Sequence, residues 1–153
     1  MRTALFSAFL ILFPLTLGAC GEPDPRSSPE RAARAFIDAL ERLELSSARR
    51  RFYMLIDEKS RATLDARARV AESLSHRPFR GPDMIVPTKS IFRFKPLPIR
   101  REDLRIEGDR ATVILRGKRD SSRAELRLVR EEEGWVVLLG LDALEEMREP
   151  EGA

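Results

Sequence analysis

The hydrophobic pattern of the chain changes once, at the breaker cluster of residues 77–82, and this change limits the fold that the chain can adopt. Before the cluster, apolar residues recur at the three- and four-residue spacing of amphipathic helices. After it, apolar and polar residues alternate, as they do in half-buried strands. Helices followed by an antiparallel meander predict an α+β fold, with the N-terminal helices packed on one face of a curved sheet of four to five strands.

Three helices are expected before the breaker cluster. The first begins at residues 28–30, where Ser-Pro-Glu supplies a cap hydroxyl, a proline at the first helical position and an acid in the positive first turn. A second helical run covers residues 48–56, and Asp57 is expected to cap a third helix that ends before Pro78. The third helix carries a thin apolar stripe, which consists of Leu64, Ala68, Ala71 and either Leu74 or one of its neighbours.

The strands are expected after residue 90, beginning with an edge strand that Pro96 stops. A glycine turn at residues 107–110 predicts a tight hairpin. The last strand is apolar on both faces, so the side that bears Val136 and Leu138 needs a cover, supplied by residues 141–147 or by a second copy of the chain. The expected strands lie at residues 90–95, 104–106, 111–116, 126–128 and 135–139.

The first 19 residues are expected to be an export signal. Their apolar run, residues 4–17, is shorter than the roughly 20 residues of a bilayer span and contains Pro14. The run ends in Leu-Gly-Ala-Cys at residues 17–20, which resembles the signal of bacterial lipoproteins. This resemblance implies that Cys20 is lipidated and becomes the first residue after cleavage; the alternative is a free or buried thiol. Gly21 then favours the outer membrane if the organism has one.

The rest of the chain divides into three parts. Residues 20–28 are rich in Gly, Pro, Ser and charge and are expected to be a tether, residues 29–148 form a single domain, and residues 149–153 are an acidic tail. The formal net charge of +3 is too balanced to predict a nucleic-acid partner. The expected partner is the membrane, reached through Cys20, on the side facing the periplasm or the exterior, with an envelope protein or a small apolar ligand as a further partner.

Two segments resemble a known superfamily. The helix that opens at residues 29–36 and the acidic turn into Gly-Trp-Val-Val at residues 134–137 are similar to those of small bacterial lipoproteins of the nuclear transport factor 2-like superfamily. The resemblance implies a cone-like fold, shared with ketosteroid isomerases, whose mouth binds a small molecule. The acid/base Asp and oxyanion-donor Tyr of the enzymatic members match no motif in this chain, so no catalytic residue is assigned.

Tyr53 and Asp57 lie one helical turn apart and could act as a hydrogen-bond donor and a carboxylate at the mouth of a cone-like fold. The alternative is that Tyr53 packs at the rim while Asp57 caps a helix. His76 is the only histidine and is expected to be exposed at a helix end, so no histidine-based triad, metal cluster or cofactor is predicted.

The proline-bounded segment at residues 79–86 holds apolar side chains outside any periodic element. Its residues Phe79, Met84 and Ile85 are expected to form a lid or a partner contact, or else to plug the core. Trp135 is expected in the core rather than as a ligand platform.

Three functions are compatible with these features. The favoured one is a lipid-anchored envelope protein whose non-catalytic domain binds a protein or a small apolar ligand. The alternatives are a small hydrolase or isomerase that uses the cone, and an electrostatic adaptor at the membrane surface. The sequence leaves both a monomer and a homodimer open.

Overall fold

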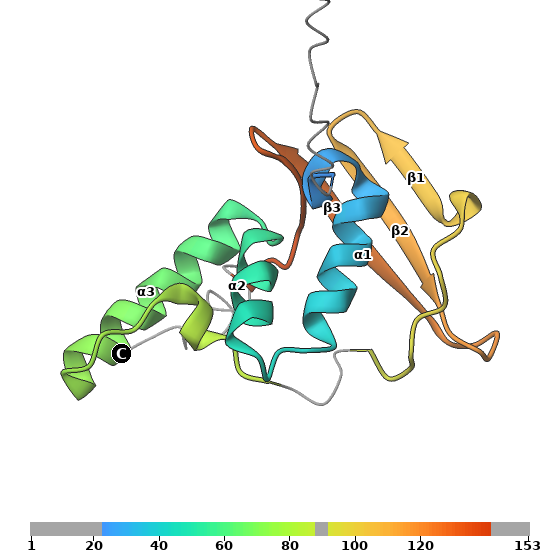
Figure 1. Ribbon diagram of the computed structural model, residues 1–153. Helices are drawn as coiled ribbons and strands as arrows, with labels where there is room; N and C mark the ends of the chain where they lie inside the picture. The colour runs from blue at the N-terminus through green and yellow to red at the C-terminus, as the bar shows by residue number, and fades with distance from the viewer. Residues whose placement is uncertain (1–22, 88–91, 142–153) are drawn as a thin grey trace, which may run out of the picture.

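The computed structural model describes residues 23–87 and 92–141 (Figure 1). Within them, the helices come first and a four-stranded antiparallel sheet follows, with its strands paired in chain order. This arrangement confirms the α+β class, while the cone-like closure stays a prediction. The helices are α1 (Pro29–Leu40), α2 (Ser46–Met54) and α3 (Glu58–Ser75), the strands are β1 (Leu104–Glu107), β2 (Arg110–Arg116), β3 (Arg123–Glu131) and β4 (Gly134–Val137), and the short 3-10 helices are η1 (Pro25–Ser27), η2 (Gly81–Met84) and η3 (Arg101–Asp103).

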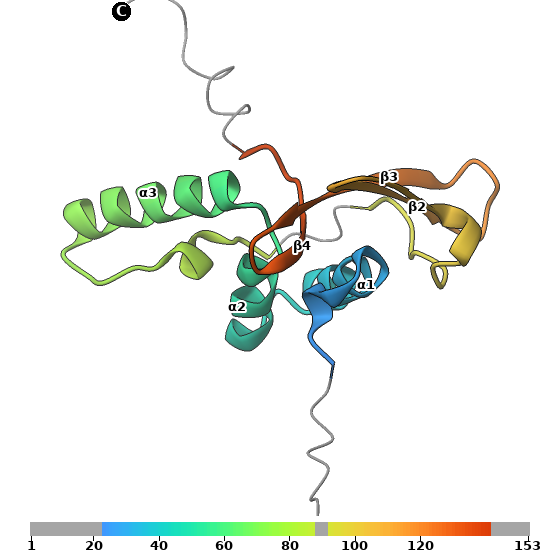
Figure 2. The ribbon, with the colours of Figure 1, turned by 90° about the horizontal axis from the view of Figure 1, so that it is seen from above.

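Helix α1 lies against one face of the sheet (Figure 2). It begins as expected, because the Ser28 hydroxyl accepts a hydrogen bond from the backbone N–H of Arg31 at 3.3 Å and Pro29 occupies the first turn. Its inner face consists mainly of alanines, with Leu40 and Phe36 as large buried residues; the Phe36 ring packs at a tilt against Phe52 of α2. Burial of a side chain of this size stabilises the fold by about 1.5–3 kcal/mol.

The sheet turns alternate side chains toward α1. Val113 of β2 lies between Leu104 and Leu126 of the neighbouring strands, and Leu128 pairs with Val137 across β3 and β4. The predicted hairpin between β1 and β2 is confirmed, with a glycine at positive φ in its turn. A one-residue slip would move this whole apolar set to the other face, so the register is strongly specified.

The corner between α2 and α3 closes the free edge of β4. The Val137 N–H donates to the Leu55 carbonyl at 2.7 Å, and the Asp57 N–H donates to the Val137 carbonyl at 3.0 Å. Ile56 thereby forms a parallel bridge with Val137. An edge covered in this way cannot pair with another chain.

The prediction of a fifth strand at residues 90–95 is wrong for the residues that the structure describes. Residues 92–95 are a bent connection, and residues 90 and 91 lie outside the described part of the chain. Pro96 and Pro98 cannot donate to a ladder, which disfavours strand pairing of this segment along the end of β2 that β1 leaves unpaired. The Leu97 N–H donates to the Arg116 carbonyl of β2 at 2.7 Å.

Two apolar positions differ from the expected burial. Leu64 and Ala68 of the predicted stripe are buried, but Leu74 is 79% exposed, because the last turns of α3 extend beyond the rest of the fold. On the outer side of β4, Val136 is fully buried and Leu138 is 48% exposed. Most of the expected cover, residues 142–147, lies outside the described residues.

The segment expected to be a tether is held on the fold from Asp24 onward. Helix η1 packs against β4, and the Arg26 guanidinium contacts the Glu133 carboxylate at 2.7 Å. This hydrogen bond and the charge of Arg26 lower the pKa of Glu133. Gly134 makes the approach possible: its φ is +123°, and a Cβ there would lie 2.6 Å from the Arg26 carbonyl oxygen.

Candidate functional site

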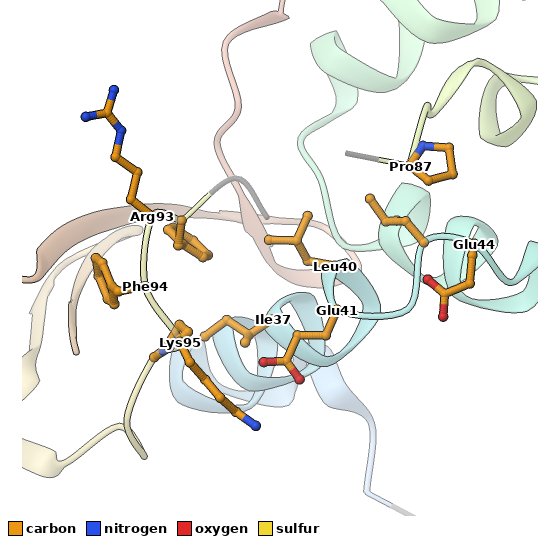
Figure 3. A pocket seen from close by; sticks show the side chains of 11 residues that line it. Ile37, Leu40, Glu41, Glu44, Pro87, Arg93, Phe94 and Lys95 are labelled. Atoms are coloured by element: carbon orange, nitrogen blue, oxygen red, sulfur yellow. The ribbon is translucent and has the colours of Figure 1, made fainter. Parts of the chain in front are cut away.

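A groove lies between the end of α1 and the segment 92–96 (Figure 3). Its volume is about 620 Å³. Most of its wall is apolar, and charged side chains stand among the lining residues. The lining residues are Ile37, Leu40, Glu41, Leu43, Glu44, Pro87, Phe92, Arg93, Phe94, Lys95 and Pro96.

The outer wall of the groove depends on two phenylalanines. The rings of Phe92 and Phe94 pack against each other, with centroids 6.2 Å apart. Gly117 lets Phe94 lie close to the turn between β2 and β3, because a Cβ at that position would lie 2.8 Å from the Phe94 ring. The failure of residues 92–95 to become a strand therefore places aromatic rings opposite α1.

Charges of both signs surround this apolar wall. Glu41 and Glu44 come from the end of α1 and the turn after it, whereas Arg93 and Lys95 come from the facing segment (Figure 3). Among the described residues, none of these four side chains takes part in an ion pair. They are available to the polar end of a molecule whose apolar part lies in the groove.

Tyr53 forms its hydrogen bond with Asp65, not with Asp57. Its hydroxyl donates to Oδ2 of Asp65 at 2.7 Å, and burial together with this bond raises the pKa of Tyr53 to about 12. Gly81 of η2 lies directly against both side chains, leaving no room for a Cβ. The pair lines a second, more open cavity of about 400 Å³ together with Phe79.

Asp57 is the buried cap of α3, as the alternative interpretation holds. Its carboxylate accepts hydrogen bonds from the Ser60 N–H at 2.9 Å, the Ser60 hydroxyl at 2.8 Å and the Leu139 N–H at 2.9 Å. Only 4% of the residue is exposed. A carboxylate held by three donors inside the fold positions the chain and is closed to a substrate.

The other expected site residues lie away from the groove. Met84 and Ile85 pack against the hydrophobic core, and η2 packs against α2 and α3. Trp135 is buried in the core, as expected. His76 is exposed and ends α3 in a left-handed conformation with φ +55°.

Sequence reasoning missed Asp65 and the groove for the same reason. Asp65 is 12 positions from Tyr53 on a different helix, and the groove joins the end of α1 to a segment more than 50 residues later. Neither contact follows from the spacing within one element. The alternating apolar residues at 92 and 94 were a usable signal, but alternation predicts a strand more often than a groove wall.

Neither a metal site nor a membrane-spanning helix is found in the described residues, and comparison with known proteins identifies no further site. Within residues 23–87 and 92–141, no group of three metal-ligating side chains is close enough to hold an ion. No helix in that part of the chain has the length and apolar character needed to cross a bilayer. Comparison with protein-family models, with curated proteins and with solved structures found no match.

The titration of Tyr53 tests the geometry of the second cavity. Because Tyr53 is the only tyrosine, its ultraviolet absorbance should show a midpoint at about pH 12 in the folded chain and near 10 after denaturation. The pKa of Tyr53 is higher in the folded chain than in the unfolded chain. The contribution of the protonated Tyr53 to the stability of the fold is therefore complete below pH 10 and is lost as the pH rises to 12. Asp65→Asn should move the folded midpoint back toward 10, and an unchanged midpoint would contradict the assigned bond.

Proposed function

We propose that the chain is an exported, lipid-anchored envelope protein whose domain binds a small amphiphilic molecule without chemical conversion. The observation that supports the binding role is the groove between α1 and the segment 92–96. The sequence at residues 17–20 supports the anchor. The ligand we infer has an apolar body and at least one charged end.

The size and lining of the groove support this ligand. Its volume of about 620 Å³ falls within the roughly 300–1,000 Å³ of small-molecule sites. Leu40, Phe92 and Phe94 supply apolar contact, which favours a hydrocarbon chain or ring over a sugar or nucleotide. The charges around the wall favour an amphiphile over a neutral hydrocarbon, because a charged end can interact there without being buried.

The position of η1 supports a domain that functions close to the membrane surface. If Cys20 carries the lipid, only residues 21–23 separate it from the docked segment, a span of about 14 Å at most. Arg31 and Arg51 line a small depression together with Pro23. Basic side chains beside the anchor favour contact with anionic lipid headgroups.

The enzymatic alternative gains no support from the two carboxylates considered for it. The carboxylate of Asp57 is fully hydrogen-bonded as a helix cap. The carboxylate of Asp65 accepts a hydrogen bond from the Tyr53 hydroxyl in a cavity that is open to solvent. With its pKa raised to about 12, Tyr53 stays protonated at neutral pH and holds that hydrogen bond. Neither arrangement supplies a base facing the groove.

Filling the groove tests the binding role. Ile37→Trp places an indole in the groove, and we expect it to weaken binding of the neutral fluorescent probe N-phenyl-1-naphthylamine about tenfold or more, as measured by titration. Ile106→Trp is the matched control, because Ile106 is a half-exposed apolar residue on β1 outside the groove. Equal affinity in both variants would exclude the groove as the binding site.

The charged residues around the groove determine which end group is bound. Replacing Arg93 and Lys95 together with alanine should weaken binding of a long-chain carboxylate several-fold, with the neutral probe unaffected. A parallel Glu41→Ala, Glu44→Ala variant should instead strengthen carboxylate binding. If neither pair changes the affinity, the ligand's charged end lies outside the groove.

A further inference from the structure

One flank of α3 presents an apolar and basic stripe. Lys59, Arg67, Val70 and Leu74 are exposed and lie on one side of the helix, with the buried Thr63 between Lys59 and Arg67. Val70 is 59% exposed and Leu74 is 79% exposed, which is unusual for two adjacent apolar positions on one helix. Figure 1 shows these last turns extending away from the sheet.

The chain leaves the described fold beside this stripe. The Leu141 N–H donates to the Ser60 hydroxyl at 3.3 Å, and Ser60 lies next to Lys59 in the first turn of α3. Two residues earlier, the Leu139 N–H is fixed on the Asp57 carboxylate. Residues 142–153 therefore start at the N-terminal end of the same helix.

The composition of residues 142–153 complements the stripe. The segment contains five acidic residues and one arginine, with Leu144 and Met147 as its large apolar residues; the acidic residues are Asp142, Glu145, Glu146, Glu149 and Glu151. Ser60 and Leu74 are about 21 Å apart along the helix axis. Six extended residues span about 20 Å, so the segment reaches the exposed end of α3.

We propose that residues 142–153 dock along this flank of α3, with Met147 covering Leu74 and the acidic side chains facing Lys59 and Arg67. Charge complementarity, the departure point at Ser60 and the reach of the segment all support the chain's own end over a second copy. This inference goes beyond the ligand-binding role and does not depend on it. It leaves the groove at α1 as the apolar surface open to a ligand.

Disulfide trapping tests the contact directly in the full chain with Cys20→Ser. Leu74→Cys combined with Met147→Cys should form a bond within one chain on mild oxidation, as shown by gel mobility and peptide mass. Glu72→Cys combined with Met147→Cys is the matched control, because Glu72 is exposed on the opposite side of α3 from Val70 and Leu74. Equal trapping at both positions would overturn the proposal. A bond between two chains would also overturn it and would assign the flank to a dimer interface.

Hydrogen exchange gives a second measurement that needs no new bond. Leu144→Asp combined with Met147→Asp should lower the protection of amides 70–75 about tenfold, because the last turns of α3 lose their cover. Ile106→Asp introduces the same kind of charge on β1 and should leave these amides unchanged. Unchanged protection in the double variant would overturn the proposal.

Discussion

Replacing Asp57 with alanine is expected to lower the free energy of unfolding by about 3 kcal/mol, a large share of the stability of a domain of this size. The carboxylate accepts three hydrogen bonds, two from Ser60 and one from the Leu139 N–H, which lies 82 positions from Asp57 along the chain. Its removal leaves the buried Ser60 hydroxyl and the Leu139 N–H without their acceptor. Urea unfolding followed by circular dichroism measures the loss.

The same substitution should loosen the closed edge of the sheet. Asp57 also donates its own N–H to the Val137 carbonyl, next to the bridge between Ile56 and β4. We therefore expect the amides around Leu139 to exchange faster in the variant than those of the hairpin between β1 and β2.

Two controls separate the buried cap from a general effect of lost charge. Asp57→Asn keeps an acceptor oxygen and should lose less stability than Asp57→Ala. Asp38→Ala removes an exposed carboxylate from α1 and should change stability by no more than about 0.5 kcal/mol. A loss below 1 kcal/mol for Asp57→Ala would contradict the bonding described for this carboxylate.

The features that the sequence predicted correctly depend on neighbouring residues. The caps at Ser28 and Asp57 and the turn at Gly108 require only a polar side chain or a flexible backbone beside a periodic run. The α+β class follows from two such periodicities in succession. Local chemistry is sufficient to specify these elements, so a single sequence reveals them.

The features that the sequence missed depend on distant residues. Leu74 fits the helical stripe but extends past the core, and residues 92–95 alternate like a strand but form a bent connection that leads into Pro96 and Pro98. The bond between Tyr53 and Asp65 joins two helices whose crossing no spacing rule predicts. The groove combines both effects, because its wall consists of the segment that did not become a strand.

The amino-acid composition of residues 24–27 also did not predict that η1 packs on the fold. Residues 24–27 are polar and proline-rich, as in a flexible linker, yet Arg26 reaches Glu133, 107 positions away. The bond needs Gly134 at positive φ to let the two backbones approach. A segment without large apolar residues thus becomes part of the fold through the ion pair of Arg26 with Glu133, the hydrogen bond from Arg31 to the Ser27 hydroxyl and the close approach at Gly134.

Cys20→Ser tests the anchor and carries the largest expected effect on location. We expect the wild-type chain to sediment with membranes and to stay there in high salt, because each buried CH₂ of an acyl chain contributes about 0.8 kcal/mol and two or more chains hold a protein firmly. The serine variant should lose the lipid, detected by the mass of the N-terminal peptide. Adding Leu17→Ala creates an Ala-Gly-Ala site at residues 17–19 that favours ordinary cleavage, so the double variant should be released into the soluble fraction.

High salt distinguishes the lipid anchor from an electrostatic adaptor. Arg31 and Arg51 beside Pro23 contribute about 1 kcal/mol each near an anionic surface, and this attraction weakens as the salt concentration rises. Release of the wild-type chain by salt alone would therefore support the adaptor, whereas retention of the double variant after a salt wash would exclude Cys20 as the attachment point. Because η1 holds residues 24–27 on the fold, a lipidated Cys20 also fixes which surface faces the bilayer. Lengthening the segment between Cys20 and Pro23 with Gly-Ser repeats should then leave membrane retention intact while reducing the salt-sensitive contribution of the two arginines.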